Sequence, residues 1–291
     1  MAGQTIQIFV PSGDPRQMRI AEITMRIVRA FEIPRSQLSE FLARRESDQV
    51  GVYFLFGEGE AGLQPVYIGQ SDGIGSRLQN HNVKSPQKDF WTRAVAVVSI
   101  TNNWTRTHTT YIEWLSIREA STIDRFVLNN GNTGSKTYTT EALEADCDEA
   151  FDTMRLLLTT LGYPLFEPLV TRGADESTVS AVPTYFCAGK GGANATGRYT
   201  AEGFVVFKGS SARRQLVESL QIHEPFVVKR QALLDSGKVV DTGDALTFAE
   251  DVLFSSPSSA ATMILGRTSN GWLDWITNDG RSLDQIERNQ G

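Results

Sequence analysis

Two short segments, Gly51-Val52-Tyr53-Phe54-Leu55-Phe56 and Val66-Tyr67-Ile68-Gly69, decide the fold of the first half of this 291-residue chain. Their aromatic and β-branched residues are typical of strands. The polar, glycine-bearing segment 57–65 between them predicts a turn, so the pair is expected to form a hairpin with a long loop. The apolar run 94–100 favours a central strand of the same sheet.

A helix is expected from about Ile74. Ile74, Arg77, Leu78 and His81 fall at the spacing of one core-facing stripe of an amphipathic helix. An unpaired buried charge is costly, so a guanidinium and an imidazole on this stripe need partners or a ligand. The sequence therefore predicts a polar cluster where this helix meets the hairpin.

A lone carboxylate, Glu113, interrupts the apolar run 111–115 on a later helix. A carboxylate in such surroundings pairs with an arginine or binds a cation. With Tyr53, Tyr67, Arg77 and His81, it completes a set of two phenols, a guanidinium, an imidazole and a carboxylate. Such a set can hydrolyse a phosphodiester with a single divalent metal ion.

The order and spacing of these residues resemble those of the GIY-YIG endonuclease family, over roughly residues 50–135. The resemblance implies that Glu113 binds one Mg²⁺ or Mn²⁺ and that Arg77 holds the phosphate. Tyr53 is our candidate general base, with Tyr67 and His81 orienting or relaying; the assignment among these three stays open. Gln70 stands where some relatives carry a lysine.

Substrate contacts are expected from two groups of residues. By resemblance, Asn130 (with Asn129 as the alternative) and His108 lie near the site; turn chemistry or a helix start would equally account for them. Segment 76–136 holds eight Lys or Arg against four Asp or Glu, although the net charge of the chain is −6. Its cations are candidates for phosphate contacts: Lys84, Lys88, Arg93, Arg106 and Arg125.

Four parts of the chain are predicted. They are a β-hairpin and helix extension over 1–50, the nuclease-like domain over 51–135, a helical acidic linker over 136–182 and a C-terminal α+β domain over 183–291. The nuclease-like domain is thus expected to be an α+β fold with a small mixed or antiparallel sheet. The C-terminal domain resembles a domain of uncharacterised function often found after GIY-YIG modules. Nucleic-acid targeting by this domain is suggested by its tryptophans and by Arg213, Arg214 and Arg267.

The composition fits a cytoplasmic protein. The sequence has no run of 18 apolar residues, so a membrane span is not predicted, and no signal peptide is expected at the N-terminus. Two cysteines are too few for a disulfide framework or a zinc site. The function expected is a metal-dependent endonuclease acting on DNA, with RNA as the alternative substrate, in phage defence or restriction. The competing hypothesis is a nucleic-acid-binding or assembly module without catalysis; the oligomeric state is not predicted.

Overall fold

The computed structural model describes residues 3–59, 64–84, 89–131, 134, 136–169 and 183–288. The chain divides into two compact α+β units, the first ending at Glu167 and the second running from Pro168. Each unit has its own sheet and its own apolar core. No helix in these ranges is both long enough and apolar enough to cross a bilayer.

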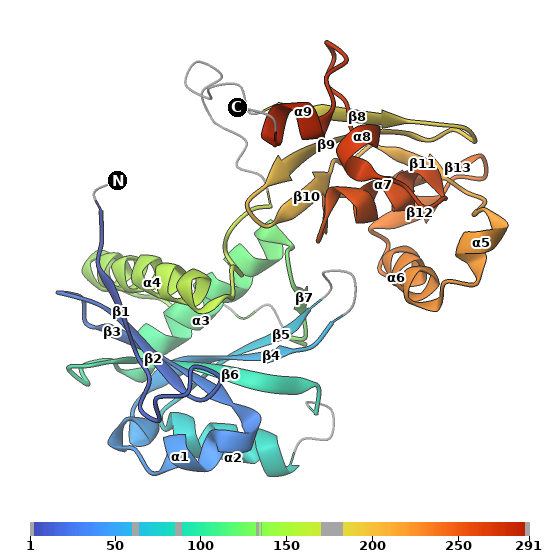
Figure 1. Ribbon diagram of the computed structural model, residues 1–291. Helices are drawn as coiled ribbons and strands as arrows, with labels where there is room; N and C mark the ends of the chain where they lie inside the picture. Colours follow the sequence, from blue (N-terminus) through green and yellow to red (C-terminus); the bar gives the residue numbers. More distant parts are fainter. Residues whose placement is uncertain are drawn as a thin grey trace. The chain divides into compact units, whose positions relative to one another are not determined.

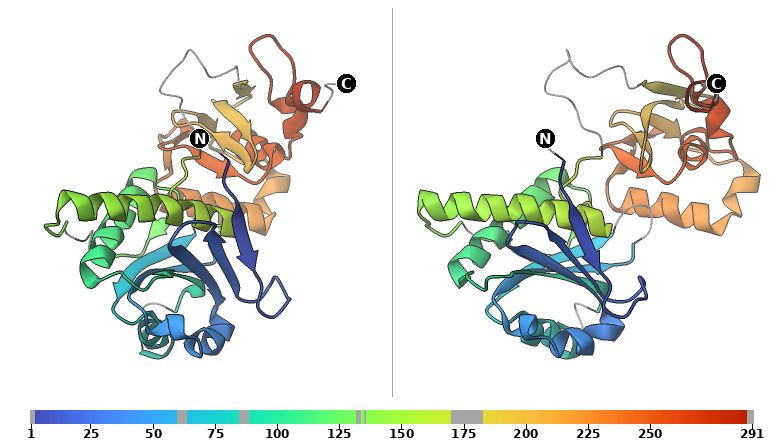
Figure 2. Two further views of the ribbon diagram at one scale, coloured as in Figure 1. Left: turned by 90° about the vertical axis from the view of Figure 1, so that its left-hand side faces the viewer. Right: turned by 60° about the vertical axis from the view of Figure 1, so that its left-hand side comes forward.

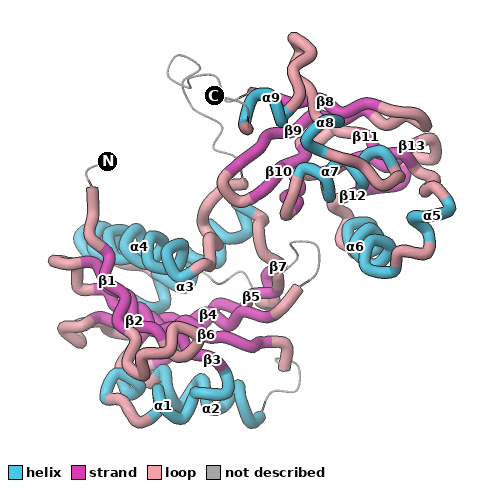
Figure 3. The backbone as a smooth tube through the Cα atoms, viewed as in Figure 1, coloured by secondary structure: helices cyan, strands magenta, loops and turns pink. Residues whose placement is uncertain are grey.

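The first unit is built on a mixed seven-stranded sheet (Figure 3). Its strands, in spatial order, are β1 (Ile6–Phe9), β2 (Arg19–Ile23), β3 (Val28–Pro34), β6 (Trp91–Ser99), β4 (Gly51–Gly57), β5 (Pro65–Ser71) and β7 (Val127–Leu128). All neighbours are antiparallel except β5 and β7, which are parallel. The expected hairpin and central strand are therefore confirmed as β4, β5 and β6.

Helices cover both faces of this sheet (Figure 1). One face carries η1 (Arg35–Gln37), α1 (Leu38–Leu42), η2 (Arg45–Asp48) and α2 (Ile74–Lys84). The other carries α3 (Arg106–Ile123) and the long α4 (Glu141–Leu161). Two apolar layers result, because alternate strand residues point to opposite faces: Tyr53 lies in the α2 layer, and Phe54 lies in the α3–α4 layer.

Local sequence explains where the two long helices begin and end. Thr105 and His108 form a reciprocal capping box at the start of α3. The side chain of Thr140 accepts a hydrogen bond from the Leu143 N–H at the start of α4, and Gly162 ends that helix in the left-handed conformation at φ 100°. The helix expected within segment 136–182 is thus present as α4.

The predicted subdivision of the first half is replaced by a single unit. Strands β1 to β3, expected as an extension, belong to the same sheet as β4 to β6. Helix α4, expected in an acidic linker, lies along the sheet of the first unit (Figure 2). Its apolar side chains, such as Met154 and Leu158, belong to the core of that unit. Leu165 and Phe166 belong to that core too. The described part of 136–182 is therefore largely structural, and residues 170–182 lie outside the described ranges.

The second unit is an antiparallel sheet with short helices. Its strands are β8 (Tyr185–Ala188), β9 (Asn194–Thr200), β10 (Gly203–Val206), β11 (Ser211–Arg213), β12 (Val239–Asp241), β13 (Ala245–Phe248) and β14 (Val252–Phe254). Its helices are α5 (Glu218–Gln221), α6 (Glu224–Asp235), α7 (Pro257–Leu265), α8 (Gly271–Asp274) and α9 (Leu283–Glu287). The Ser256 side chain caps α7 by accepting a hydrogen bond from the Ser259 N–H, and Pro257 follows as the first helical residue.

Candidate active site

Two glycines allow the aromatic strands to pack with α2. Gly69 lies opposite Tyr53 in the β4–β5 ladder, and the Tyr53 ring covers it. A Cβ at Gly69 would come within 2.9 Å of Tyr53 Cε1 and closer still to its hydroxyl oxygen. At Gly51, a Cβ would collide with Ile74, the first residue of α2, and with the Val97 carbonyl. Each glycine therefore makes room for a neighbour that the site requires.

Tyr53 connects the hairpin to α2. Its side chain is completely buried, and its hydroxyl lies 2.8 Å from His81 Nε2 and accepts a hydrogen bond from Arg77 Nε at 3.2 Å. Burial, and secondarily the neighbouring Tyr67 hydroxyl, raises the pKa of Tyr53 well above its ordinary value of 10.0. A phenol in this state stays protonated at neutral pH, so Tyr53 is poorly suited to the general-base role expected of it.

The second phenol, Tyr67, completes a cluster of three rings. Its ring centroid lies 6.1 Å from that of Tyr53 and 5.5 Å from that of His81, and its side chain is half-buried. Arg77 also contacts the Tyr67 hydroxyl. The expected stripe on α2 is correct for Ile74, Leu78 and His81, which are buried, but Arg77 is exposed at the edge of the cluster.

Glu113 approaches from the opposite layer, on α3, at the end of β5. Its carboxylate is half-buried, and burial raises its pKa above the ordinary 4.5. The backbone N–H of Gln70 and the positive charge of Arg77 oppose that rise without cancelling it. Glu113 forms no ion pair with any residue of the described ranges. One residue before it, Ile112 is fully buried, so the helix fixes the carboxylate at the edge of the core.

The donors at this position fit a hydrated hard cation. Mg²⁺ keeps several of its waters and is commonly held by only one or two carboxylates. Glu113 supplies one carboxylate, and no group of three or more His, Cys, Asp or Glu suited to a metal occurs among the described residues. A site with several protein ligands, such as structural zinc, does not fit these donors.

The residues expected around the site lie in several places. Asn130 is engaged with the backbone: its side-chain amide accepts from the Ile68 N–H at 3.0 Å and donates to the Ile68 carbonyl at 2.8 Å. It thereby continues the β5–β7 pairing beyond β7. His108 caps α3 and faces α4, on whose side it lines a separate pocket with Asp146. The structure thus does not bring His108 together with the Tyr53 cluster.

Several candidate phosphate contacts are already occupied. Arg93 is paired at 3.1 Å with the buried Glu32, and the Tyr163 hydroxyl donates to the same carboxylate at 2.8 Å. Arg125 donates to the Glu167 carbonyl at 3.2 Å. Arg106 is exposed and lies 3.4 Å from Asp72. Lys88 and the side chain of Lys84 lie outside the described residues.

In the second unit, most of the expected targeting residues have intramolecular partners. Trp275 is fully buried, and its indole N–H donates to the Pro257 carbonyl. Trp272 is half-buried, with the Arg288 guanidinium 3.4 Å from its ring centroid. Arg214 and Arg267 pair with Asp241 at 2.9 Å and with Asp274 at 3.5 Å. The side chain of Arg213 packs between the glycine turn at Gly191 and Gly266.

Two features of the first unit were missed by the sequence interpretation, one at the site and one away from it. Gln70 contributes through its backbone N–H, which no side-chain pattern reveals, and its Oε1 lies 3.4 Å from the Thr109 hydroxyl. The buried ion-pair cluster around Glu32 was also missed. Its signal is a single acid in the apolar β3 run Val-Arg-Ala-Phe-Glu-Ile.

Comparison with known proteins identifies part of the second unit. Residues 185–287 match the family model described as Domain of unknown function (DUF4357). The match covers β8 through α9 and leaves the first unit outside it. No curated protein and no solved structure matches the chain.

Proposed function

We propose that the first unit is a metal-dependent endonuclease of the GIY-YIG type, acting on the phosphodiester bonds of DNA. The observation that carries the proposal is the convergence of five side chains from four elements at one end of the sheet. Tyr53 and Tyr67 contact each other, and each contacts both His81 and Arg77. The charge of Arg77 also acts on Glu113. Phosphodiester hydrolysis needs this combination of cation, proton carrier and metal ligand.

The positions of these residues suggest a different role for each. Arg77, exposed and tethered to Tyr53, is the group that binds the scissile phosphate through the remaining N–H groups of its guanidinium. Tyr53 is a positioning residue, because its hydroxyl is enclosed by Arg77 and His81. Tyr67 is the phenol at the edge of the cluster, where its hydroxyl, in contact with Arg77, could orient the attacking water by a hydrogen bond.

Glu113 would hold Mg²⁺ or Mn²⁺. When bound, such a cation lowers the pKa of a coordinated water and neutralises charge on the phosphoryl oxygens. Without the metal ion, Glu113 is a half-buried carboxylate that forms no ion pair among the described residues. The cation is therefore expected to stabilise the ionised form of Glu113.

The experiment is cleavage of plasmid and single-stranded DNA by the full chain, with Mg²⁺ and with EDTA. Glu113→Ala should abolish cleavage, and Arg77→Lys should lower the rate by about 10²-fold or more, since one lost transition-state donor costs ~3 kcal/mol. Glu119→Ala on the same helix is the matched control, because Glu119 pairs with Arg118. Mg²⁺-dependent cleavage that survives Glu113→Ala refutes the assignment. Binding of DNA without cleavage would favour a non-catalytic module.

A further inference from the structure

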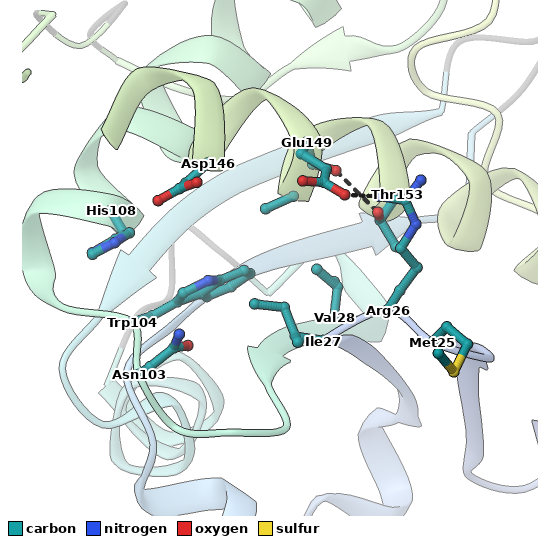
Figure 4. Close-up of a pocket in the computed structure, with 11 residues that line it drawn as sticks. Met25, Arg26, Ile27, Val28, Asn103, Trp104, His108, Asp146, Glu149 and Thr153 are labelled. Carbon is teal, nitrogen blue, oxygen red and sulfur yellow. Dashed lines mark hydrogen bonds and ion pairs between the residues drawn. The ribbon is translucent and has the colours of Figure 1, made fainter. Parts of the chain in front are cut away.

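A pocket separate from the candidate active site lies in the first unit, between the β2–β3 turn, the start of α3 and α4 (Figure 4). Its volume is about 280 Å³. Ile27, Val28 and the Trp104 indole form its apolar surface, with Asp146 and His108 on one side and Arg26 and Glu149 on the other. None of the five residues proposed for catalysis lines it.

Met25, at the rim of this pocket, is hard to explain by stability. Its side chain is 95% exposed, and its backbone has φ 72°, in the left-handed region that favours glycine. A large apolar side chain there hides no surface and costs backbone energy. Strain of this kind is found where function requires a particular side chain. Methionine is also common on surfaces that bind several related peptides.

Trp104 offers a ligand in this pocket an apolar surface and a hydrogen-bond donor. Its side chain is 7% exposed, and its indole N–H donates no hydrogen bond to any described residue. This nitrogen is not among the buried polar atoms that lack a partner, so it is accessible from the pocket. Figure 4 shows the indole lying across the middle of the pocket lining. An occupant with a carbonyl oxygen could accept a hydrogen bond from this accessible N–H.

The charge around the pocket selects the kind of occupant. Helix α4 carries six Asp or Glu and one Arg. Glu149 is neutralised by Arg26, whereas Asp146 makes no ion pair with the described part of the chain. Such a surface repels phosphate and attracts cations, which disfavours nucleic acid. A polypeptide can offer a cation, an apolar side chain and a backbone carbonyl together.

We propose that this pocket binds a basic peptide segment of a partner protein. A Lys or Arg of the segment pairs with Asp146, an adjacent apolar side chain packs against Met25 and Ile27, and a backbone carbonyl accepts from Trp104 Nε1. The interaction is separate from phosphodiester cleavage. It gives the acidic face of α4, unsuited to nucleic acid, a role in assembly with another protein.

The test uses the full chain and a displayed library of random peptides. Peptides selected on the wild type should be rich in Lys or Arg beside an apolar residue. Their affinity should fall at least about tenfold for each of Met25→Gly, Asp146→Asn and Trp104→Phe, since each removes a contact to the peptide. Asp152→Asn, the same change at an exposed position of α4 outside the pocket, should have no effect.

Met25→Gly separates a binding role from a structural one. Glycine relieves the left-handed backbone, so this variant should unfold at a higher temperature than the wild type while it loses peptide affinity. A lower unfolding temperature would show that Met25 serves the fold and would overturn the proposal. So would selection of no peptides, selection of acidic or neutral ones, or equal binding by all variants. Loss of single-stranded DNA affinity in these variants, with peptide binding unchanged, would assign the pocket to nucleic acid instead.

Discussion

Gly69→Ala is the sharpest perturbation of the candidate active site, because it moves Tyr53 without changing any polar group. The added Cβ would lie 2.9 Å from Tyr53 Cε1, whereas an ordinary contact begins at 3.4 Å. The ring must therefore retreat by about 0.5 Å at Cε1 and by more at the hydroxyl. Tyr53 is completely buried among core residues, so it cannot move without disturbing them.

Two energetic consequences follow from that displacement. Overpacking of a filled core costs about 1–3 kcal/mol. The hydroxyl also leaves His81 Nε2, now 2.8 Å away, and Arg77 Nε, now 3.2 Å away, at a cost of about 1 kcal/mol for each hydrogen bond. We expect the free energy of unfolding to fall by about 2–4 kcal/mol. Cleavage should slow by about 10²-fold, the typical effect of a 1 Å misplacement.

Urea unfolding and DNA cleavage measure the two effects on the same protein. Gly73→Ala is the matched control, because its Cβ would meet only the rotatable Ser76 hydroxyl, at 3.3 Å. It should change stability by less than about 1 kcal/mol. A Gly69→Ala protein as stable and as active as the control would refute both the packing argument and the positioning role of Tyr53.

Three further outcomes are expected. Because burial raises the pKa of Glu113, the folded protein loses stability as the pH rises from 4.5 through the raised value. In EDTA, the Glu113→Gln variant should therefore be more stable than the wild type at neutral pH and lose that advantage below pH 4.5. A pH series of urea unfolding measures this difference. His108→Ala should cost about 1 kcal/mol through the lost α3 capping box, yet leave the cleavage rate unchanged. Arg93→Met should destabilise the fold by about 1–3 kcal/mol, since it leaves Glu32 less well paired, while the salt dependence of DNA affinity stays that of the wild type.

The sequence was most informative where one periodicity dominated. The β4–β5 hairpin, β6, and the helices from Ile74 and Thr140 follow from local pattern, because strand alternation and capping residues act over a few positions. The domain boundary did not follow. Acidic residues on α4 suggested a linker, but their carboxylates are mostly on the exposed side of a helix whose other side fills the core. Charge counts do not report which side of a helix is buried.

Side-chain roles were harder to predict than elements. A basic residue gives the same signal whether it binds phosphate or pairs with a buried acid 61 positions away, as Arg93 does with Glu32. The sequence around Asn130 likewise fits either a turn residue or a residue that contacts substrate. In the structure, its side-chain amide hydrogen-bonds with the backbone of β5. Partners that the chain brings together from distant positions decide these roles, and local spacing carries no record of them.

The residues of the two aromatic strand segments and the Glu113 carboxylate carry different weight as indications of catalysis. Packing alone explains Gly51, Gly69 and Tyr53: the two glycines leave room at the junction of the hairpin with α2, and the Tyr53 ring fills the room at Gly69. A non-catalytic module of the same fold would need them too. Glu113 has no such explanation, because burial raises its pKa and it forms no ion pair with the described residues. A residue kept at the expense of stability indicates function. The stability gained by Glu113→Gln, and a stabilisation of the wild type by Mg²⁺ that the variant lacks, would therefore support a metal-dependent enzyme before any substrate is known.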